Sequence, residues 1–363
     1  MAGNIRQPID TLALSRYIQQ NVPSIELPFK LKQFNHGQSN PTYEITSLSG
    51  EKFVLRKKPP GKLVSKSAHR VEKEFEVLTA LAQTDVPVPK TFAYCEDEAV
   101  LGTPFYIMEF LDGRIFEDPW LPNMSPAART DIWKEAVRTL GRLHSVNLSA
   151  VGLHGWKRPS AFYNRQIQSL DRVSLAQAKT LSKISRQEVG RLPYYEELIR
   201  FFTDAELQPA DRKTLVHGDF KLDNLVFHKT EPRVIGILDW EMATEGHPLS
   251  DYVNLVSPFL WAAEQVPSKF RSGAVIGLPS LEQCRQWYCE AVGWDTTQDM
   301  EWAVAFANFR TAIIMQGIMA RLVTGQASGV EAKQFALQSI PYALWSYARA
   351  QKIKVGKHQP SKL

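Results

Sequence analysis

The sequence has little cysteine, and the cysteine it has follows no disulfide or metal-binding pattern. Its three cysteines, Cys95, Cys284 and Cys289, form no Cys-x-x-Cys spacing and have no histidine cluster beside them. Such a pattern is typical of a reduced protein without disulfides or structural zinc. We therefore expect neither a disulfide scaffold nor a zinc site.

Signals for secretion and for membrane insertion are also lacking. The first ten residues, MAGNIRQPID, have no apolar core of the kind that a secretory signal needs. The most apolar stretch starts at Ala303, but it contains Asn308, Arg310 and Gln316, which are costly to place in lipid. It predicts a buried helix, and we expect no membrane span.

The charge is nearly balanced, with 43 basic and 38 acidic residues in 363. The two signs are interleaved and form no basic stripe. A nucleic-acid-binding surface is therefore not expected, and a small anionic substrate is favoured. The length exceeds the size at which a single hydrophobic core usually stops growing, so we expect two lobes with a cleft.

The chain up to residue 111 predicts a small lobe built on a sheet. After a leading helix at 9–20, apolar and polar residues alternate through 29–61 with turn clusters NHGQSNP and SLSG, which predicts three strands. Residues 67–82 have helical spacing, and the stretches VPVPKTFAYC and TPFYIMEFLDG predict two further strands. The N-lobe is thus expected to hold a five-stranded antiparallel sheet.

Beyond residue 112, long helical periods predict a larger, mainly helical lobe. They cover 126–145, 163–184, 193–204, 280–292, 299–325 and 331–351. Among them, NLVFH and RVIGILDW flank the turn KTEP and predict a small hairpin. We therefore predict an α+β, bilobal fold with an N-lobe at 1–111, a C-lobe at 112–354 and a flexible tail at 355–363.

The stretch HGDFKLDN, residues 217–224, contains three groups able to handle phosphate or metal: Asp219, Lys221 and Asn224. Its spacing, His-x-Asp-x-x-x-x-Asn, is the catalytic-loop pattern of kinases, in which the aspartate orients or accepts the proton of the attacking hydroxyl and the asparagine holds Mg²⁺. We assign Asp219 as the catalytic base. Lys221 either neutralises the transferring phosphoryl group or is a solvated lysine, and His217 is predicted to be structural.

A second metal ligand follows across the predicted hairpin. Asn224 leads into the first strand, and VIGILDW brings Asp239 back beside it. Two protein oxygens completed by phosphates and water are usual for Mg²⁺. HGDFKLDN alone would also fit a polar turn, so it is the combination with Asp239 that indicates a metal site at Asn224 and Asp239.

A kinase-like site also needs a phosphate-covering turn and a cation on the third strand. The turn NHGQSNPTY has a single glycine, so Ser39, Asn40 and nearby backbone amides are predicted to contact phosphate, although an ordinary hairpin turn fits the pattern better. FVLR places Arg56 where kinases carry lysine, with Lys57 and Lys58 as rivals. An arginine fork can clamp phosphate, but it is not equivalent to the point charge of a lysine.

The helix at 67–82 and the strand after it supply the remaining nucleotide-binding positions. Glutamates at 72, 74 and 76 compete to pair with the cation, and Glu74, which borders the apolar face, is preferred. YIMEFLDG predicts the connection between the lobes, with Met108 behind an adenine pocket and the backbone from Glu109 to Leu111 bonding the base. It fits a buried strand leaving the sheet equally well.

The chain resembles the aminoglycoside and choline phosphotransferase superfamily of protein-kinase-like enzymes in six ordered motifs: HGQSNPTY, VLRKKPPGKL, IMEFLDG, HGDFKLDN, ILDWE and GHPLSD. It is most similar to the branch that forms the kinase domain of acyl-CoA dehydrogenase family members ten and eleven. The resemblance runs from about residue 27 to about residue 350 and includes FRTAIIMQGIMARLVTGQASG. It implies the aminoglycoside phosphotransferase fold.

The resemblance also implies a function, namely transfer of phosphate from ATP, with Mg²⁺, to a small-molecule hydroxyl. Asp219 is then the base, and Asn224 and Asp239 are the metal ligands. The branch is associated with hydroxylated fatty acyl-CoA, notably 4-hydroxyacyl-CoA, as the acceptor. Family members often carry Asp where this chain has His247, so the role of that position stays open. An aminoglycoside-, choline- or sugar-like acceptor is the alternative, and a catalytically inactive nucleotide-binding scaffold is a third reading.

The sequence ends in Ser361, Lys362 and Leu363 after the polar stretch KVGKHQP. Ser-Lys-Leu at a free C-terminus is the signal that the peroxisomal import receptor recognises. We therefore expect a peroxisomal location, which suits an acyl-CoA substrate, and otherwise a cytoplasmic one.

Overall fold

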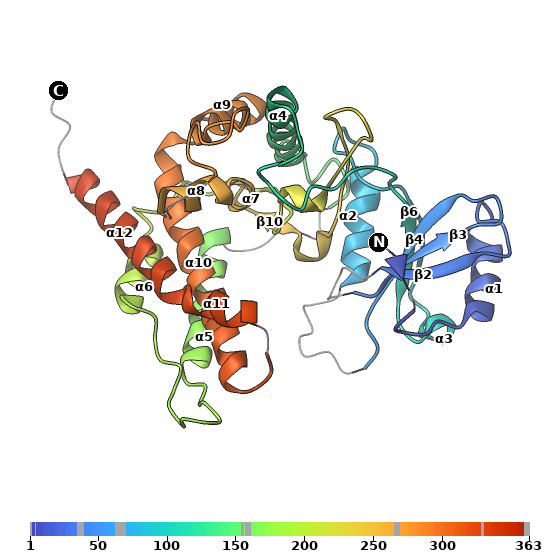
Figure 1. Cartoon of the computed structure of the whole chain (residues 1–363), viewed down its shortest axis with the longest axis horizontal. Coiled ribbons are helices and arrows are strands. Elements are labelled where there is room, and N and C mark those ends of the chain that lie inside the picture. The colour runs from blue at the N-terminus through green and yellow to red at the C-terminus, as the bar shows by residue number, and fades with distance from the viewer. Residues whose placement is uncertain are drawn as a thin grey trace. The chain divides into compact units, whose positions relative to one another are not determined.

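The computed structural model describes residues 2–3, 5–34, 40–61, 70–153, 156, 161–264, 269–327 and 330–358. The chain forms two compact units (Figure 1). Unit 1 comprises Met1–Trp156 and His217–Thr244, and unit 2 comprises Lys157–Val216 and Glu245–Leu363. These units do not coincide with the boundary at residue 112, and the division into lobes at 1–111 and 112–354 stays a prediction. The C-terminal tripeptide Ser361–Leu363 lies outside the described residues.

Unit 1 is built on an antiparallel sheet with the strand order β1-β2-β3-β4-β6-β5. The strands are β1 (Ala2–Gly3), β2 (Lys30–Phe34), β3 (Thr42–Thr46), β4 (Lys52–Lys57), β5 (Thr91–Cys95) and β6 (Phe105–Glu109). The helices of this unit are α1 (Thr11–Asn21), α2 (Val71–Leu81), α3 (Glu98–Leu101) and α4 (Pro126–His144). The five strands predicted from alternation are all present. The short strand β1 is an addition, because two residues carry no alternation that a sequence pattern can reveal.

Alternation along β4 decides which side chain faces which helix. Phe53 and Leu55 are buried in the core that α1 covers. Because successive side chains of a strand point to opposite faces, Arg56 faces away from this core. Lys57 returns to it, where its Nζ donates a 2.8 Å hydrogen bond to the backbone oxygen of Leu101 in α3.

Helix α2 covers the other face of the sheet and carries a buried glutamate. The ring of Phe75 lies 5.5 Å from that of Tyr94 on β5 and 6.1 Å from that of Tyr106 on β6. These contacts bring the preceding residue, Glu74, into the packed layer, where it is only 1% exposed. A carboxylate is almost never buried without a partner, so this packing requires a cation on the same face of the sheet.

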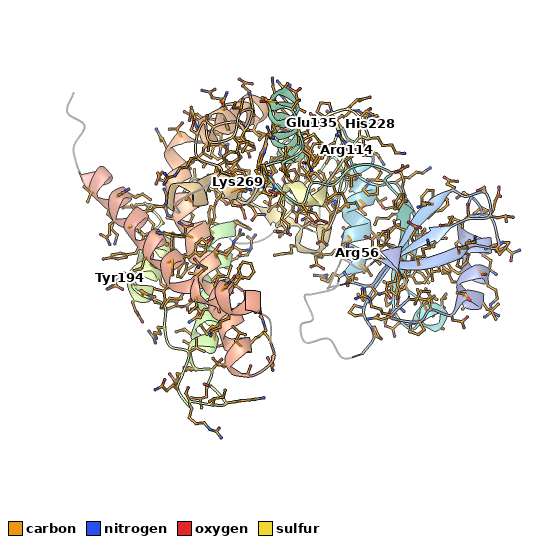
Figure 2. The ribbon with its side chains drawn as sticks, in the orientation of Figure 1. Arg56, Arg114, Glu135, Tyr194, His228 and Lys269 are labelled. Carbon is orange, nitrogen blue, oxygen red and sulfur yellow. The ribbon has the colours of Figure 1, made fainter. Side chains whose placement is uncertain are left out.

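The predicted hairpin is present as β8 (Leu225–Phe227) and β9 (Val234–Ile237). The segment that follows β6 lies against it. The backbones of Arg114 and Phe227 exchange two hydrogen bonds of 2.7 and 2.8 Å. The guanidinium of Arg114 also donates to the backbone oxygen of His228 (Figure 2). Gly113 has no room for a side chain, because an added Cβ would lie 2.3 Å from the backbone oxygen of Phe227. These contacts join the hairpin to the exit of the sheet.

Unit 2 is mainly helical, and the long helix α10 lies in its core. Its elements are α5 (Phe162–Ala178), α6 (Tyr195–Thr203), β7 (Thr214–Val216), β10 (Thr244–Gly246), α7 (Leu249–Leu255), α8 (Ser257–Glu264), α9 (Leu281–Val292), α10 (Thr297–Val323), α11 (Val330–Leu337) and α12 (Ser339–His358). Helix α10 packs against α5, α7, α11 and α12. It alone among the described helices is long and apolar enough to cross a membrane, yet 56% of its most apolar window is buried inside the protein, as expected of a core helix.

Two of the predicted helices differ from the observed ones. The helix expected at 331–351 is divided between α11 and α12, and α12 continues to His358, into the stretch predicted as a tail. Pro341 explains the division, because proline lacks an N–H and is tolerated only in the first turn of a helix. The helix expected at 163–184 ends at Ala178, since the backbone oxygen of Thr180 accepts from Val189 instead.

Gly113→Ala is expected to lower the melting temperature of the protein, because the new methyl group would overlap a backbone oxygen of the hairpin. The expected cost is about 1–3 kcal/mol, the usual range for overpacking. Scanning calorimetry measures it, with Gly356→Ala as the control, because a Cβ at Gly356 in α12 meets nothing within 4 Å. A Gly113→Ala protein that melts at the temperature of the Gly356→Ala control would contradict the close approach.

Candidate functional site

His217 fixes the backbone at the start of the loop formed by residues 217–224. Its side chain is fully buried. The ring Nδ1 accepts a 3.2 Å hydrogen bond from the backbone N–H of Asp219, so Nε2 carries the proton and donates to the backbone oxygen of Leu238 at 2.8 Å. The imidazole therefore ties the loop to the end of β9, next to Asp239.

Gly218 allows the loop to pass close to the 3-10 helix η3 (Trp240–Met242). Its φ of 91° lies in the left-handed region, which glycine adopts at little cost. An added Cβ would also lie 2.7 Å from the Cβ and 2.9 Å from the backbone oxygen of Met242. The glycine of HGDFKLDN is thus required both by conformation and by space.

Asp219 is held by the side chain of Asn224 and accompanied by a lysine. The Nδ2 of Asn224 donates to the backbone oxygen of Asp219 at 2.7 Å and to its Oδ2 at 3.1 Å. The Nζ of Lys221 lies 3.4 Å from Asp219 Oδ2 and 3.3 Å from Asp223 Oδ2. Burial acts to lower the pKa of Lys221, but the two aspartates outweigh it and the pKa is raised. The loop therefore presents an oriented carboxylate beside a charged ammonium group.

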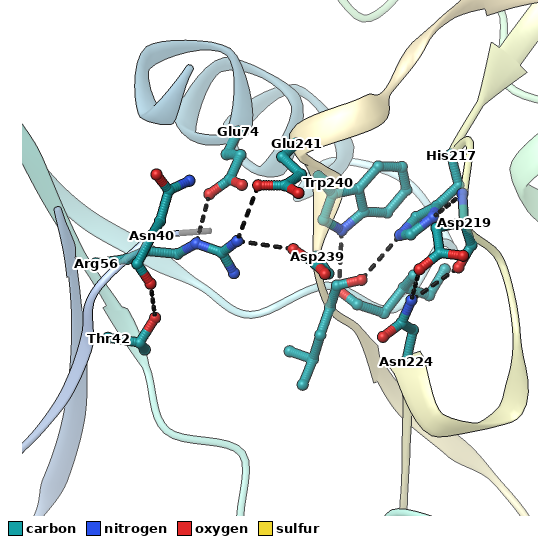
Figure 3. A network of polar contacts seen from close by, with 12 residues as sticks. Asn40, Thr42, Arg56, Glu74, His217, Asp219, Asn224, Asp239, Trp240 and Glu241 are labelled. Atoms are coloured by element: carbon teal, nitrogen blue, oxygen red, sulfur yellow. Dashed lines mark hydrogen bonds and ion pairs between the residues drawn. The ribbon is translucent and has the colours of Figure 1, made fainter. Parts of the chain in front are cut away.

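Asp239 follows β9 in a backbone conformation that is unusual for a residue with a side chain. Its φ of 67° and ψ of 59° are left-handed, a conformation that is often found at functional sites when the residue is not glycine. The preceding residue, Leu238, donates its N–H to the backbone oxygen of Asn224 at 2.9 Å. The hairpin thus brings Asn224 and Asp239 together, as its length predicts, and Figure 3 shows Asp239 between Arg56 and the Asp219–Asn224 pair.

Arg56 connects the sheet, helix α2 and the segment after β9. Its Nε lies 3.0 Å from Glu74 Oε2, and its Nη2 lies 2.7 Å from Asp239 Oδ1. The same Nη2 is 3.8 Å from Glu241 Oε2. One guanidinium therefore faces three carboxylates (Figure 3), and one ligand oxygen from each of these acids lies within 4.8 Å of the others.

Glu241 is the member of this group that the sequence does not single out. It lies in η3, whose tight turn follows the left-handed Asp239 and brings the carboxylate back toward Arg56. The available signal was the last letter of ILDWE, an acid two residues after the predicted metal ligand. No periodicity predicts where a side chain points after a left-handed residue, so the motif alone could not place Glu241.

Burial and charge act against each other in this cluster. Burial acts to lower the pKa of Arg56, but the charges of Glu74 and Asp239 contribute to a net rise, so the guanidinium stays charged. Burial raises the pKa of Glu74 to about 7, although Arg56 and the hydroxyl of Tyr106, which donates to Glu74 Oε2 at 2.9 Å, oppose the rise. Burial is the main cause of the raised pKa of Glu74, and the nearby carboxylates of Asp239 and Glu241 add smaller contributions in the same direction.

The two lysines that follow Arg56 have other partners. Lys57 donates to a backbone oxygen on the opposite side of the sheet, and burial lowers its pKa. The Nζ of Lys58 lies 3.0 Å from Glu72 Oε2. Of the three candidate cations, Arg56 is therefore the one that pairs with Glu74.

The oxygen atoms around Asp239 suit a magnesium ion. Because the amide nitrogen of Asn224 is bonded to Asp219, its amide oxygen is turned away from that bond and is available to a metal. Within the described part of the chain, Glu74 Oε1 and Glu241 Oε2 are buried without a hydrogen-bond partner. Carboxylate and amide oxygens form the hard ligand set that Mg²⁺ prefers, and the side chains of Asn224 and Asp239 offer oxygens of these two kinds.

The predicted phosphate-covering turn is described only at its end. Ser39 lies outside the described residues. Asn40 is 1% exposed and precedes β3, and Figure 3 shows it beside Arg56. Contact between Asn40 and phosphate stays a prediction.

The predicted adenine-binding positions follow one another at the end of β6. Met108 is buried in the sheet. The backbone N–H of Glu109 donates a 2.8 Å hydrogen bond to the backbone oxygen of Lys90, so this N–H already has a partner within the protein. The backbone oxygen of Leu111 accepts from Gly113 at 3.1 Å. Binding of a base at these positions stays a prediction.

Comparison with known sequences gives one matching family model and a set of similar relatives. The family model described as "Phosphotransferase enzyme family" matches residues 30–287. Mouse acyl-CoA dehydrogenase family member 10 is 38% identical over 339 residues, which cover 92% of this chain but 30% of the mouse protein. The chain covers 42% or less of the length of six further relatives named as acyl-CoA dehydrogenases, so it corresponds to only a part of each of them.

Solved structures agree with the predicted fold. A protein from Ralstonia eutropha assigned to the aminoglycoside phosphotransferases is 36% identical with a TM-score of 0.80, over 95% of this chain and 99% of that one. The ternary complex of streptomycin, ATP and APH(2″)-IIa is similar over 91% of this chain and 98% of that one, with a TM-score of 0.58 at 14% identity. The second likeness concerns the fold alone, and together they confirm the α+β, protein-kinase-like architecture.

His217→Ala is expected to loosen the loop at 217–224 and to lower the free energy of unfolding. The cost is about 1–3 kcal/mol, because the backbone oxygen of Leu238 and the N–H of Asp219 lose a buried partner. Hydrogen exchange followed by mass spectrometry measures the loop directly and should show faster exchange there. His228→Ala, a change of a part-exposed histidine in the β8–β9 turn, is the control, and equal exchange of the loop in both variants would contradict the anchoring role of His217.

Proposed function

We propose that this chain, which belongs to the phosphotransferase enzyme family, transfers the γ-phosphate of ATP to a hydroxyl group of a small molecule. In such a reaction the bond between the γ-phosphorus and the β–γ bridging oxygen breaks, a bond from phosphorus to the acceptor oxygen forms, and ADP leaves. The hydroxyl proton passes to Asp219. ATP as the donor is supported by the ATP complex of the structural neighbour named above.

One observation carries the proposal, namely the position of Asp219, Asn224 and Asp239 around one hairpin. Asn224 orients the Asp219 carboxylate through a 3.1 Å hydrogen bond. The backbone bond from Leu238 to Asn224 places Asp239 next to the same loop. A base and two metal-binding oxygens on one hairpin and the loop before it suit phosphoryl transfer, because most of its catalysis comes from positioning and charge neutralisation.

Each residue then has a distinct task. Asp219 aims the acceptor hydroxyl at the γ-phosphorus and receives its proton. Lys221, whose Nζ is 3.4 Å from Asp219, neutralises charge on the phosphoryl group in transit. Asn224 and Asp239 hold Mg²⁺, which when bound compensates the negative charge of the phosphates. Arg56, held by Glu74, supplies a further cation on the nucleotide side.

For the acceptor we propose a hydroxylated acyl-CoA of the 4-hydroxyacyl-CoA type, in fatty-acid catabolism. The support is the similarity of nearly the whole chain to one part of proteins that are named acyl-CoA dehydrogenase family members. A phosphorylated hydroxyl is a better leaving group than a free one, so such a kinase would prepare its substrate for elimination. The peroxisomal location expected from Ser361–Leu363 suits this acceptor and stays a prediction.

A second acceptor class has its own support. The Ralstonia eutropha protein assigned to the aminoglycoside phosphotransferases matches over almost its whole length at 36% identity. An aminoglycoside, choline or sugar hydroxyl is therefore the alternative acceptor. The catalytic roles in unit 1 would be the same for both classes.

Asp219→Asn is expected to leave folding and nucleotide binding intact and to reduce turnover by about 10²–10⁴-fold, the usual contribution of a positioned general base. Asp223→Asn is the matched control, because Asp223 contacts the same lysine at 3.3 Å and is similarly exposed. Steady-state ADP release measures both variants. Equal turnover of the two variants would remove Asp219 from its role.

The acceptor is tested by incubating the protein with Mg-ATP and a panel of 3-, 4- and 5-hydroxyacyl-CoAs, choline and kanamycin. Mass spectrometry of the products is expected to show the gain of one phosphate on a hydroxyacyl-CoA. Phosphate on choline or kanamycin alone would keep the phosphotransferase and reject the acyl-CoA acceptor. Absence of product with every acceptor would contradict the proposed activity.

A further inference from the structure

The guanidinium of Arg56 contacts its three carboxylates unequally. Its contacts to Glu74 and Asp239 are 3.0 and 2.7 Å long, whereas Glu241 Oε2 is 3.8 Å from Nη2. The last distance is too long for a hydrogen bond. Yet Glu241 Oε2 is buried and has no hydrogen-bond partner among the described residues. An unbonded buried oxygen of an acid is costly, so the contacts present here do not account for the position of Glu241.

Asp239 has two competing partners under the proposed function, on which this inference rests. Its Oδ1 accepts from Arg56 Nη2, and the same carboxylate is to hold Mg²⁺. Two cations on one carboxylate repel each other, and in a part-buried site water screens this repulsion weakly. A metal ion on Asp239 therefore weakens its bond to Arg56, and by linkage Arg56 weakens the binding of the metal ion.

The arginine fork has a fixed and a movable end. Tyr106 holds Glu74 Oε2 through a 2.9 Å hydrogen bond, and the same oxygen faces Nε of Arg56. The contact of Nε with Glu74 is an ion pair and not a hydrogen bond, and this ion pair can persist while Nη2 moves. The 3.8 Å separation from Glu241 becomes an ordinary hydrogen bond of about 2.9 Å after a shift of roughly 1 Å. A lysine has a single nitrogen and cannot keep one carboxylate while exchanging another.

We propose that Glu241 accepts the hydrogen bond of Arg56 Nη2 when Asp239 binds Mg²⁺ together with the nucleotide. Nη2 then moves from Asp239 to Glu241, while Nε stays paired with Glu74. Glu241 is then a positioning residue that acts through Arg56. It removes the competition for Asp239 and keeps the guanidinium paired in both states. This accounts for the unbonded Glu241 oxygen and for an arginine at a position where kinases carry lysine.

The test measures the binding of Mg²⁺ to the full-length protein at saturating AMP-PNP, a non-transferable ATP analogue, by isothermal titration calorimetry. Glu241→Gln is expected to raise the dissociation constant of Mg²⁺ by about fivefold or more, the lower end of measured couplings between sites. Glu72→Gln is the control for loss of a nearby negative charge, because Glu72 pairs with Lys58 and has no ion pair with Arg56. It should bind Mg²⁺ as the wild type does.

A second background separates transfer of Arg56 from simple electrostatics. In Arg56→Met/Glu74→Gln, where the moving cation and its buried partner are both removed, adding Glu241→Gln should change the Mg²⁺ dissociation constant by less than about twofold, because the coupled partner is gone. If that background does not fold, Arg56→Lys replaces it, since the lysine cannot bridge Glu74 and Glu241. The effect of Glu241→Gln should disappear there as well.

Three outcomes overturn the inference. If Glu241→Gln weakened Mg²⁺ binding equally in both backgrounds, Glu241 would act as a direct ligand of Mg²⁺ or through its negative charge alone. If Glu241→Gln bound Mg²⁺ with wild-type affinity, the movement of Arg56 Nη2 to Glu241 would be rejected. That result would not contradict the proposed phosphotransferase activity. Failure of the wild type to bind Mg²⁺ with AMP-PNP would overturn the proposed function together with the inference.

Discussion

The buried ion pair between Arg56 and Glu74 is the constraint on which the rest of the site depends. Packing of Phe75 against the sheet places Glu74 where water cannot solvate it, and strand alternation places Arg56 on the same face. Neither group is tolerable there alone, since an unpaired charge in the interior costs several kcal/mol. Because Arg56 also contacts Asp239, this local requirement fixes the segment after β9 relative to the sheet. The positions of Arg56, predicted to contact phosphate, and of Asp239, a predicted metal ligand, are therefore set by the same ion pair.

The sequence predicted those features that follow from period and spacing. Five strands, the hairpin and the meeting of Asn224 with Asp239 follow from alternation and from a short turn between two apolar runs. The choice among Arg56, Lys57 and Lys58 did not follow, although alternation contains the answer: residues 56 and 57 must face opposite sides of β4. Knowing which side carries α2 required the folded chain.

Other features lay beyond any pattern. The left-handed Asp239 redirects the chain, so Glu241 points where neither a strand nor a helix period would place it. The division between α11 and α12 depends on Pro341, which lies in the first turn of α12. A proline is compatible both with the end of one helix and with the start of the next, so the residue alone did not predict two helices. The two-residue strand β1 is a strand because it pairs with β2, which is distant in the sequence.

The path of the chain between the two units has a consequence for how this protein varies. The candidate site residues from Asn40 to Glu241 belong to unit 1, whereas Lys157–Val216 is an excursion into unit 2. Unit 1 resumes at His217, whose ring fastens the returning chain to Leu238. Insertions or deletions within the excursion leave each bonded pair of the site in register. In evolutionary terms, this segment can change in length and sequence while the hydrogen bonds that His217 and Asn224 make in unit 1 are kept.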